Sequence, residues 1–172
     1  LDEAAAVRLM PVRPAEAHKG TMGHLLAVVG SRGKSGAAVL TARAALRSGV
    51  GLVTVATPRS IQPVVATAQP EVMTEPLAET ARGALGRGAA AAAVRLLSSR
   101  DALALGPGLG NEPATRAAVA VLVAGRTAAA VLDADGLNAF SAELRPRLRL
   151  RAGRHPLILT PHPGEAARLS GT

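Results

Sequence analysis

The sequence predicts an α/β fold in which a mainly parallel sheet is covered by helices on both faces. Short apolar runs alternate with segments of helical spacing, and the runs end in glycine-rich or polar loops. The first unit has a strand over 25–29, a glycine-rich loop over 30–36, a helix over 37–48 and a strand over 52–56. Parallel strands joined by helices form sheets that are buried on both faces.

The same unit recurs through the rest of the chain, whose 172 residues suffice for one compact domain. Further strands are expected over 102–105, 128–132 and 156–160, and further helices over 84–97 and 113–124. Open α/β sheets bind ligands at the carboxyl ends of their strands. The loops at 30–36, 106–110, 133–138 and 161–165 are therefore expected to surround one cleft.

Composition removes several classes of function. The chain has no cysteine, which excludes disulfide frameworks, thiolate metal sites and a cysteine nucleophile. No apolar run approaches the roughly 18 residues of a membrane span, so a cytoplasmic protein without membrane association is expected. The formal charge of +8 suits an anionic nucleotide ligand.

Nucleic acid is not an expected partner. Phe140 is the only aromatic residue, so bases cannot stack on aromatic side chains as they do in many single-strand binders. Alternating arginines are interpreted as a solvated edge, because nothing beside them reads bases: Arg145, Arg147, Arg149, Arg151 and Arg154. A non-catalytic nucleic-acid or nucleotide-binding module remains the alternative of a different class, and strongly salt-dependent DNA binding would favour it.

Neither glycine-rich loop has the spacing of a known nucleotide motif. Val28 stands where a P-loop ending in Gly33-Lys34-Ser35 needs its first glycine, and neither loop has the Gly-x-Gly-x-x-Gly spacing. Glycines still let the backbone approach a ligand, and helix N-termini attract anions. Tight turns between strand and helix explain each loop equally well.

Polar residues after the later strands are candidate contacts, each with a structural alternative. Asp133 can bind a hydroxyl group or a metal-bound water, whereas Asp135 is better explained as a helix cap. His162 is held between two prolines at a strand end, although a buried, satisfied histidine is the commoner outcome. Glu165 falls in the first turn of a helix, where a negative charge is favourable in any protein.

Six segments follow one another in a fixed order over residues 18–172. They are His18-Lys-Gly-Thr-Met-Gly-His24, Gly30-Ser31 with Gly36-Ala-Ala38, Ala44-Ala-Leu-Arg-Ser-Gly-Val-Gly-Leu-Val-Thr54, Gly106-Pro-Gly-Leu-Gly110, Val131-Leu-Asp-Ala-Asp-Gly-Leu-Asn138 and Leu159-Thr-Pro-His-Pro-Gly-Glu165. Together they resemble the NAD(P)H-hydrate dehydratases. The resemblance implies a ribokinase-like three-layer α/β/α sandwich with a mainly parallel sheet.

The resemblance also implies an activity and a site. Members repair NADH or NADPH that has taken up water, using ADP or ATP, with Mg²⁺, to phosphorylate the ring hydroxyl before phosphate leaves. By this likeness Ala37, Gly108 and His162 line the hydrate pocket, and Lys19, Asp133 and Asn138 lie near it. A homo-oligomer is expected. A ribokinase-superfamily kinase of a small alcohol, such as a thiazole or another vitamin precursor, is the related alternative.

The family pattern has parts that residues 1–172 do not contain. Members continue to a Lys-Gly…Thr segment that holds the adenine nucleotide and to a Gly-Thr-Gly-Asp loop whose aspartate is the base. By this likeness the catalytic aspartate lies beyond Thr172. We therefore expect 18–172 to be the N-terminal two-thirds of the domain, an incomplete sandwich that ends one turn into a helix, has no catalytic residue and is inactive alone.

Residues 1–17 are interpreted as a helix and linker. They resemble the linker that follows an epimerase domain in two-domain relatives, although single-domain members have their own extensions. Fusion to an epimerase domain is therefore one of two open interpretations of this segment.

Overall fold

The strands form one parallel sheet. A computed structural model describes residues 2–9, 13–140 and 155–171. The strands are β1 His24–Val28, β2 Leu52–Pro58, β3 Met73–Leu77, β4 Ala102–Leu105, β5 Ala129–Leu132 and β6 Leu157–Leu159. They lie in the order β3-β2-β1-β4-β5-β6, and each neighbouring pair is parallel. The parallel sheet predicted from the sequence is confirmed.

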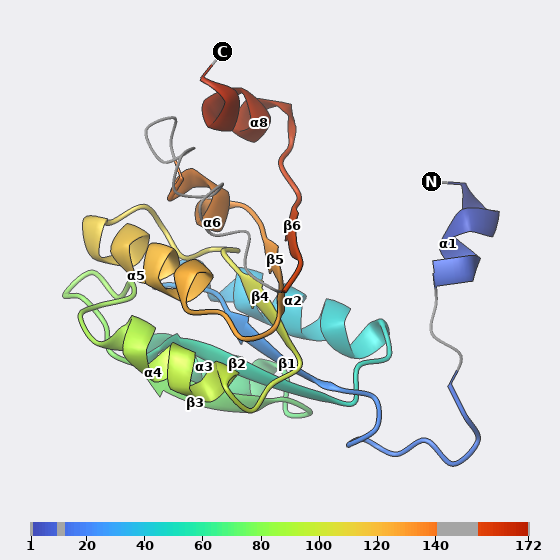
Figure 1. Ribbon diagram of the computed structural model, residues 1–172. Coiled ribbons are helices and arrows are strands. Elements are labelled where there is room, and N and C mark those ends of the chain that lie inside the picture. The colour runs from blue at the N-terminus through green and yellow to red at the C-terminus, as the bar shows by residue number, and fades with distance from the viewer. Residues whose placement is uncertain (1, 10–12, 141–154, 172) are drawn as a thin grey trace.

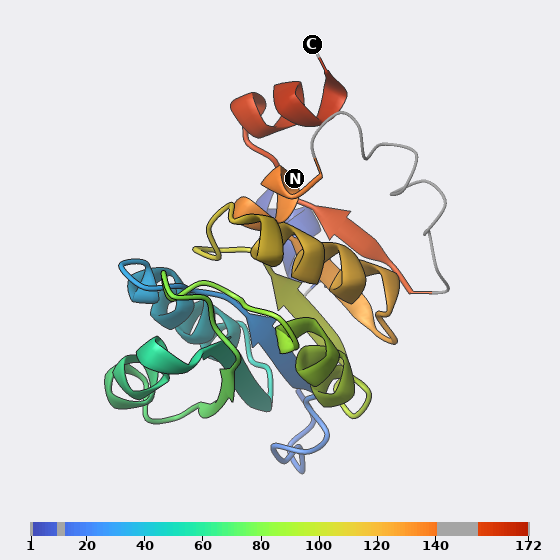
Figure 2. The same ribbon diagram turned by 90° about the vertical axis from the view of Figure 1, so that its left-hand side faces the viewer.

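Helices lie on both faces of this sheet. Helices α4 Ala89–Leu97 and α5 Pro113–Ala124 lie on one face, and α2 Ser35–Arg47 and α3 Gln62–Ala68 lie on the other. The other helices are α1 Glu3–Leu9, α6 Asp135–Asn138 and α8 Pro163–Ser170, with a helical turn η1 at Arg59–Ile61. Alternate residues of β1 enter opposite cores: Leu26 packs with α4 and α5, whereas Ala27 packs with α2 and α3. Figure 1 shows α4 and α5 in front of the sheet, and the side view separates the two helix layers (Figure 2).

Small aliphatic side chains fill the interior on the α2 side. Ala38, Ala42 and Ala45 recur at helical spacing and form the buried stripe of α2. They pack in one core cluster with Ala27 of β1, with Val29 just after it, and with Val53 and Val55 of β2. Methyl side chains keep the helix close to the sheet, which brings the first residues of α2 near the loops at the strand ends.

Three details differ from the expectations. The helix expected over 84–97 begins only at Ala89, because Gly88 adopts a left-handed conformation with φ 86° and Gly86 packs against the backbone of Glu79. Helix α8 has eight residues instead of one turn, and Gly171 follows it at φ 70°. The sequence did not predict α3 and β3, which lie between β2 and α4.

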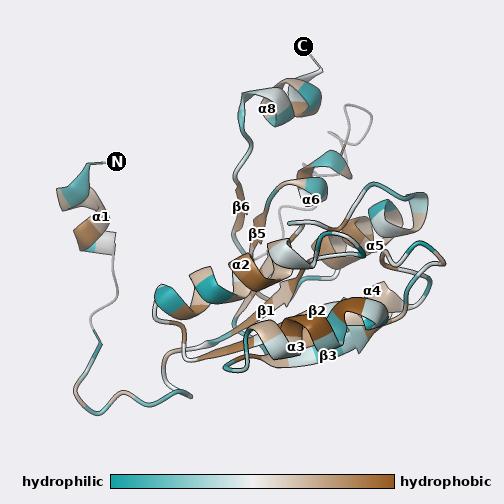
Figure 3. Ribbon diagram, turned by 180° about the vertical axis from the view of Figure 1, so that it is seen from behind, coloured by the Kyte–Doolittle hydropathy of each residue, from teal (hydrophilic) through white to brown (hydrophobic). Residues whose placement is uncertain are grey.

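One part of the sheet has no described helix over it. On the α2 side, β4, β5 and β6 line an apolar groove of about 470 Å³ that includes Ala104, Val131 and Ile158. Ile158 is 56% exposed. Seen from behind, the hydrophobic colour of β5 and β6 lies beside α2 (Figure 3).

The remaining segments lie outside the sandwich or outside the described residues. Helix α1 stands apart from the sheet in Figure 1. The alternating arginines at 145–154 and the final residue, Thr172, belong to the part of the chain that is not described. Over the described ranges, none of the helices has the length and apolar character that crossing a membrane requires.

Candidate functional site

The carboxyl ends of four strands are level with one another. The sheet register pairs Val28 with Leu105, Leu105 with Leu132, and Leu132 with Leu159. The loops after β1, β4, β5 and β6 therefore leave the sheet from one row of residues. The predicted gathering of these loops at one edge of the sheet follows from this register.

The strand order reverses between β1 and β4, where the first two glycine loops meet. From β1 the chain moves to β2 and β3 on one side, and then returns to β4 on the other. Open α/β sheets bind ligands in the crevice at such a reversal. Gly30 N donates a hydrogen bond of 2.8 Å to Pro107 O, and Ser31 Oγ donates one of 2.7 Å to Gly108 O. Two hydrogen bonds thus hold the loops after β1 and β4 together at this reversal.

Ala37 and Gly108 lie against each other where these two loops meet. Gly108 has φ 69°, and a Cβ placed on it would stand 2.7 Å from the Cβ of Ala37 and 3.1 Å from the carbonyl oxygen of Lys34. No side chain larger than hydrogen fits at position 108 without movement of its neighbours. The contact leaves bare backbone beside a single methyl group, a surface that a flat ring can approach.

The carboxylate of Asp135 connects both glycine loops. Its Oδ2 accepts a hydrogen bond of 2.8 Å from Gly110 N and lies 3.1 Å from Lys34 Nζ. Helix α6 has no side-chain cap bond, and its N-cap residue is Ala134. The expectation that Asp135 caps a helix is therefore wrong, because this carboxylate reaches away from its own helix to the loops of β1 and β4.

Asp133 and Asn138 lie on either side of Asp135. Asp133 follows β5 directly, and its Oδ1 accepts a hydrogen bond of 2.8 Å from Thr160 Oγ1 beyond β6. Asn138 Oδ1 accepts one of 3.1 Å from Arg168 Nε of α8. Both side chains are partly exposed, so each keeps contact with solvent at the carboxyl edge.

His162 begins α8 and caps it. Its Nδ1 accepts a hydrogen bond of 3.1 Å from Gly164 N, while His162 N donates one of 3.0 Å to Glu165 Oε2. This reciprocal pair is a capping box. The imidazole is exposed instead of buried, with 63% of the side chain accessible, and its Nε2 is 3.4 Å from Glu165 Oε1. Glu165 lies in the first turn of the helix as predicted, and it is buried.

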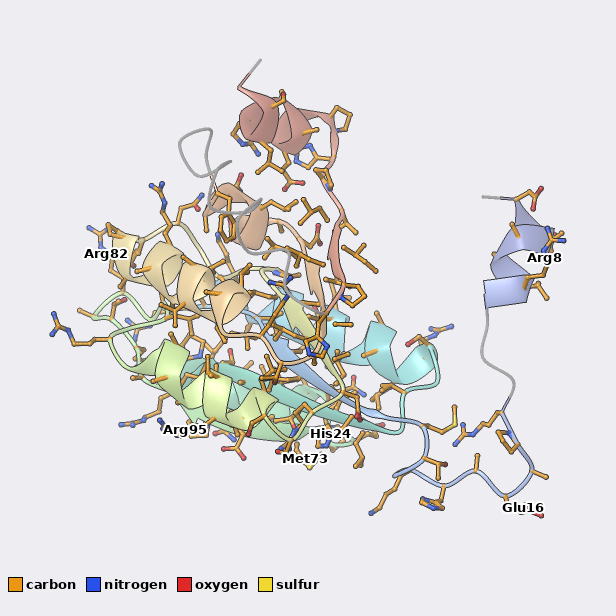
Figure 4. The ribbon with its side chains drawn as sticks, in the orientation of Figure 1. Arg8, Glu16, His24, Met73, Arg82 and Arg95 are labelled. Atoms are coloured by element: carbon orange, nitrogen blue, oxygen red, sulfur yellow. The ribbon has the colours of Figure 1, made fainter. Side chains whose placement is uncertain are left out.

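Lys19 is not brought to this edge within the chain. Its carbonyl oxygen packs against Gly51, the residue before β2, so Lys19 lies at the amino edge of the sheet. Figure 4 marks this edge by His24 and Met73, the first residues of β1 and β3. The segment leads into the start of β1, which is why its position differs from the one expected beside the hydrate pocket.

The expected catalytic aspartate is not among these residues. It was placed beyond Thr172, and Thr172 itself lies outside the described residues, so its location stays a prediction. The described chain reaches Gly171, which ends α8 at the carboxyl edge of the sheet. The residues described at this edge are thus candidates for binding the hydrate, and none of them is assigned as the base.

The structure also shows site residues that the sequence did not single out. Ser31, Lys34 and Gly110 hold the loops together, and Thr160 and Arg168 hold Asp133 and Asn138. Lys34 stands among glycines at the start of a helix, and Ser31, Gly110 and Thr160 stand in segments that carry the family resemblance. Their roles depend on partners that are distant in sequence, which no local pattern reveals.

No metal site is formed by the described side chains. Nowhere in residues 2–9, 13–140 and 155–171 do three His, Cys, Asp or Glu side chains cluster closely enough to hold a metal ion. Asp133 and Asp135 are instead engaged with a hydroxyl, an amide and an ammonium group. We therefore assign Mg²⁺ to none of these residues.

The fold is that of the ribokinase-like α/β/α proteins. A ribokinase-like superfamily protein from Enterococcus faecalis superposes with a TM-score of 0.79 at 22% identity, covering 99% of this chain and 56% of its own. An ADP/ATP-dependent NAD(P)H-hydrate dehydratase from Bacillus subtilis, co-crystallised with ATP and Mg²⁺, superposes with a TM-score of 0.74 at 31% identity, covering 99% of this chain and 55% of its own.

Residues 25–172 match the NAD(P)H-hydrate dehydratase family, and the chain belongs to that family. The bifunctional NAD(P)H-hydrate repair enzyme Nnr of Moorella thermoacetica is 48% identical over 164 residues, which are 95% of this chain and 30% of the relative. The ADP-dependent (S)-NAD(P)H-hydrate dehydratase of Xanthomonas campestris pv. campestris is 38% identical over 168 residues, 98% of this chain and 55% of the relative. The chain thus spans between about a third and about half of these relatives.

Proposed function

We propose that residues 18–172 supply the hydrate-binding part of an ADP- or ATP-dependent NAD(P)H-hydrate dehydratase. The contact between Ala37 and Gly108 at the strand-order reversal carries this proposal. A hydrated nicotinamide ring has apolar faces and carries a hydroxyl and a carboxamide group at its edge, so an apolar surface with polar groups beside it would suit it. Backbone and one methyl group offer the surface, and Asp133, Asn138 and His162 offer the rim.

The chain's residues bind and orient the hydrate. Ala37 and Gly108 would contact the ring, and Asp133 would accept a hydrogen bond from its hydroxyl group. The adenine nucleotide supplies the phosphoryl group that turns this hydroxyl into a phosphate, a far better leaving group than hydroxide. The ring nitrogen's lone pair then expels phosphate and leaves an iminium ion, and loss of a proton from the neighbouring ring carbon restores the dihydronicotinamide.

Other expectations remain proposals. The Nnr relatives are named bifunctional NAD(P)H-hydrate repair enzymes. This name supports fusion to a second repair domain in the protein that contains this chain. The homo-oligomeric state and the cytoplasmic location stay predictions. Lys19 could join the site only if it came from a neighbouring copy of the chain, since its own copy holds it at the other edge.

The activity is tested on the protein as its gene encodes it. Purified protein is incubated with hydrated NADH and ADP or ATP with Mg²⁺, and recovery of the dihydronicotinamide absorbance is followed. We expect nucleotide-dependent recovery. No recovery, together with phosphorylation of a thiazole alcohol or another vitamin precursor by ATP, would instead establish the small-alcohol kinase.

A pair of variants tests the pocket itself. Ala37→Val adds two methyl groups beside Gly108, so it should raise KM for the hydrate without changing KM for ADP. Gly36→Ala is the matched control, because a Cβ at position 36 meets nothing within 4 Å. Equal effects of the two substitutions would show that the ring does not rest on Ala37.

A further inference from the structure

Asp135 closes a ring of contacts around the Gly108 turn. Gly110 N donates to its Oδ2 at 2.8 Å, and Lys34 Nζ lies 3.1 Å from the same oxygen. The backbone of Lys34 in turn adjoins Gly108, since a Cβ on Gly108 would stand 3.1 Å from Lys34 O. The ring therefore runs from Gly108 to Lys34, across to Asp135 and back to Gly110.

The Gly108 turn needs such fastening. Gly108 and Gly110 have φ of 69° and 80°, which glycine adopts about as readily as negative φ, so these two residues do not fix the conformation of the turn by themselves. Ser31 Oγ binds the carbonyl of Gly108 from one side, and Asp135 binds the amide of Gly110 from the other. The two bonds fix both ends of a turn whose middle carries no side-chain bond in the described structure.

The bond from Asp135 is of a strong kind. The side chain of Asp135 is only 17% exposed, whereas that of Lys34 is 50% exposed. A hydrogen bond from an amide to a partly buried carboxylate is stronger than one between neutral groups. The carboxylate thus holds Gly110 N directly, whereas the half-exposed Lys34 side chain binds the carboxylate.

We propose that Asp135 is a positioning residue, which holds Gly108 against Ala37 and thereby sets the affinity for the hydrated nicotinamide. This inference rests on the proposed function. Asp135 acts through the backbone of 108–110 and through Lys34, without touching the nicotinamide ring. Nothing in its local sequence separates it from an ordinary helix cap.

The test compares Asp135→Ala and Asp135→Asn with Asp101→Ala in the protein as its gene encodes it. Asp101 is a matched control, because its Oδ2 also accepts one distant backbone hydrogen bond, from His24 N at 2.7 Å, but at the amino edge. Asparagine at 135 can still accept from Gly110 N and loses only the charge. Steady-state kinetics, thermal melting and amide hydrogen exchange are measured for each variant.

We expect Asp135→Ala to raise KM for hydrated NADH by about tenfold, with KM for ADP unchanged. Asp135→Asn should raise it less. Amides of 106–110 should exchange faster in Asp135→Ala, and not in Asp101→Ala. If Asp135 had only a structural role, Asp135→Ala would lower the melting temperature as Asp101→Ala does, and neither variant would change KM for the hydrate.

Two results would overturn the proposal. One is an unchanged KM for the hydrate in both Asp135 variants. The other is unchanged exchange of 106–110, and this readout does not depend on turnover. If the unaltered protein restores no NADH, the proposed function fails by itself, while the exchange data still decide whether Asp135 holds the Gly108 turn. If Asp135→Ala does not fold, the asparagine variant decides both questions.

Discussion

The hydroxyl of Thr160 donates a hydrogen bond of 2.8 Å to Oδ1 of Asp133. Thr160 N also donates to Leu132 O at 3.3 Å, and Asp133 N donates to Leu105 O at 3.1 Å. Asp133 is therefore tied to the ends of both β4 and β6. The Thr160 hydroxyl that holds the Asp133 carboxylate can be removed by substitution. The orientation of the carboxylate can therefore be tested separately from its chemical role.

We expect Asp133→Ala to lower kcat/KM for the hydrate by about 10-fold to 100-fold, the usual effect of losing a hydrogen bond to a charged group. The free energy of unfolding should fall by only about 0.5–1.5 kcal/mol, because the lost bond to Thr160 is exposed. Steady-state kinetics and thermal melts of the full protein measure the two effects.

Thr160→Val is the control for Asp133. It removes the same hydrogen bond and leaves the carboxylate in place, so it should cost similar stability and much less activity. If the two variants lose equal activity, or if unfolding accounts for the loss in Asp133→Ala, then Asp133 has only a structural role.

The role of the His162 imidazole and the helix-capping role of His162 can be tested separately. Asparagine is a good N-cap residue, so His162→Asn should keep α8 stable, whereas His162→Ala should cost about 0.5–2 kcal/mol of stability. If the imidazole contacts the hydrate, both variants should lose turnover to a similar extent. Full activity in the asparagine variant would leave His162 with the capping role alone.

Gly108 and Gly33 form a second matched pair. Both have positive φ, but a Cβ at position 108 would be 2.7 Å from the Ala37 Cβ, whereas one at position 33 meets nothing within 4 Å. Alanine at either position should cost about 1–2 kcal/mol of backbone strain. Only Gly108→Ala should also raise KM for the hydrate, and the second change Ala37→Gly should recover part of that loss. Equal kinetics in the two alanine variants would contradict the assigned contact.

The sheet was predictable wherever its strands are continuous apolar runs. The run 25–29 and the segment 102–105 have this character, and both are central strands. Strand β3 was missed because Glu75 and Pro76 interrupt it. Its place at the edge of the sheet explains why a charge and a residue without an amide hydrogen are tolerated there.

The site was predictable only in part, because local patterns do not show long-range partners. Asp133 and Gly108 stand directly after strands, so their edge of the sheet follows from the fold. Asp135 looked like a cap, since its partner Gly110 is 25 residues away and its partner Lys34 is 101 residues away. Lys19 stands in one of the segments that carry the family resemblance. The direction of β1, however, places Lys19 at the amino edge of the sheet, away from the site.

His24 should make stability depend on pH. Burial lowers the pKa of His24 below 6.5, and Arg100 adds to this, although Asp101 opposes it. Because the folded state then binds this proton less readily than the unfolded state, stability is complete above about pH 6.5 and falls as pH drops through 6.5 toward the folded pKa. We expect the urea midpoint to fall in that window, and to fall less in His24→Gln. The exposed His18→Gln serves as the control, and an unchanged slope in His24→Gln would contradict this origin.

The chain of 172 residues, purified alone, should bind the nicotinamide and leave the hydrate unrepaired. It contains the contact of Ala37 with Gly108 and lacks any Gly-Thr-Gly-Asp segment up to Thr172. General-base catalysis is typically worth about 10²–10⁴-fold, and the family resemblance places the aspartate that acts as the base beyond Thr172. Incubation with hydrated NADH, ADP and Mg²⁺ should therefore give no recovery of absorbance above the protein-free rate. NADH fluorescence should still report binding that Gly108→Ala weakens. Recovery above that rate would show that a group within residues 1–172 takes the hydroxyl proton.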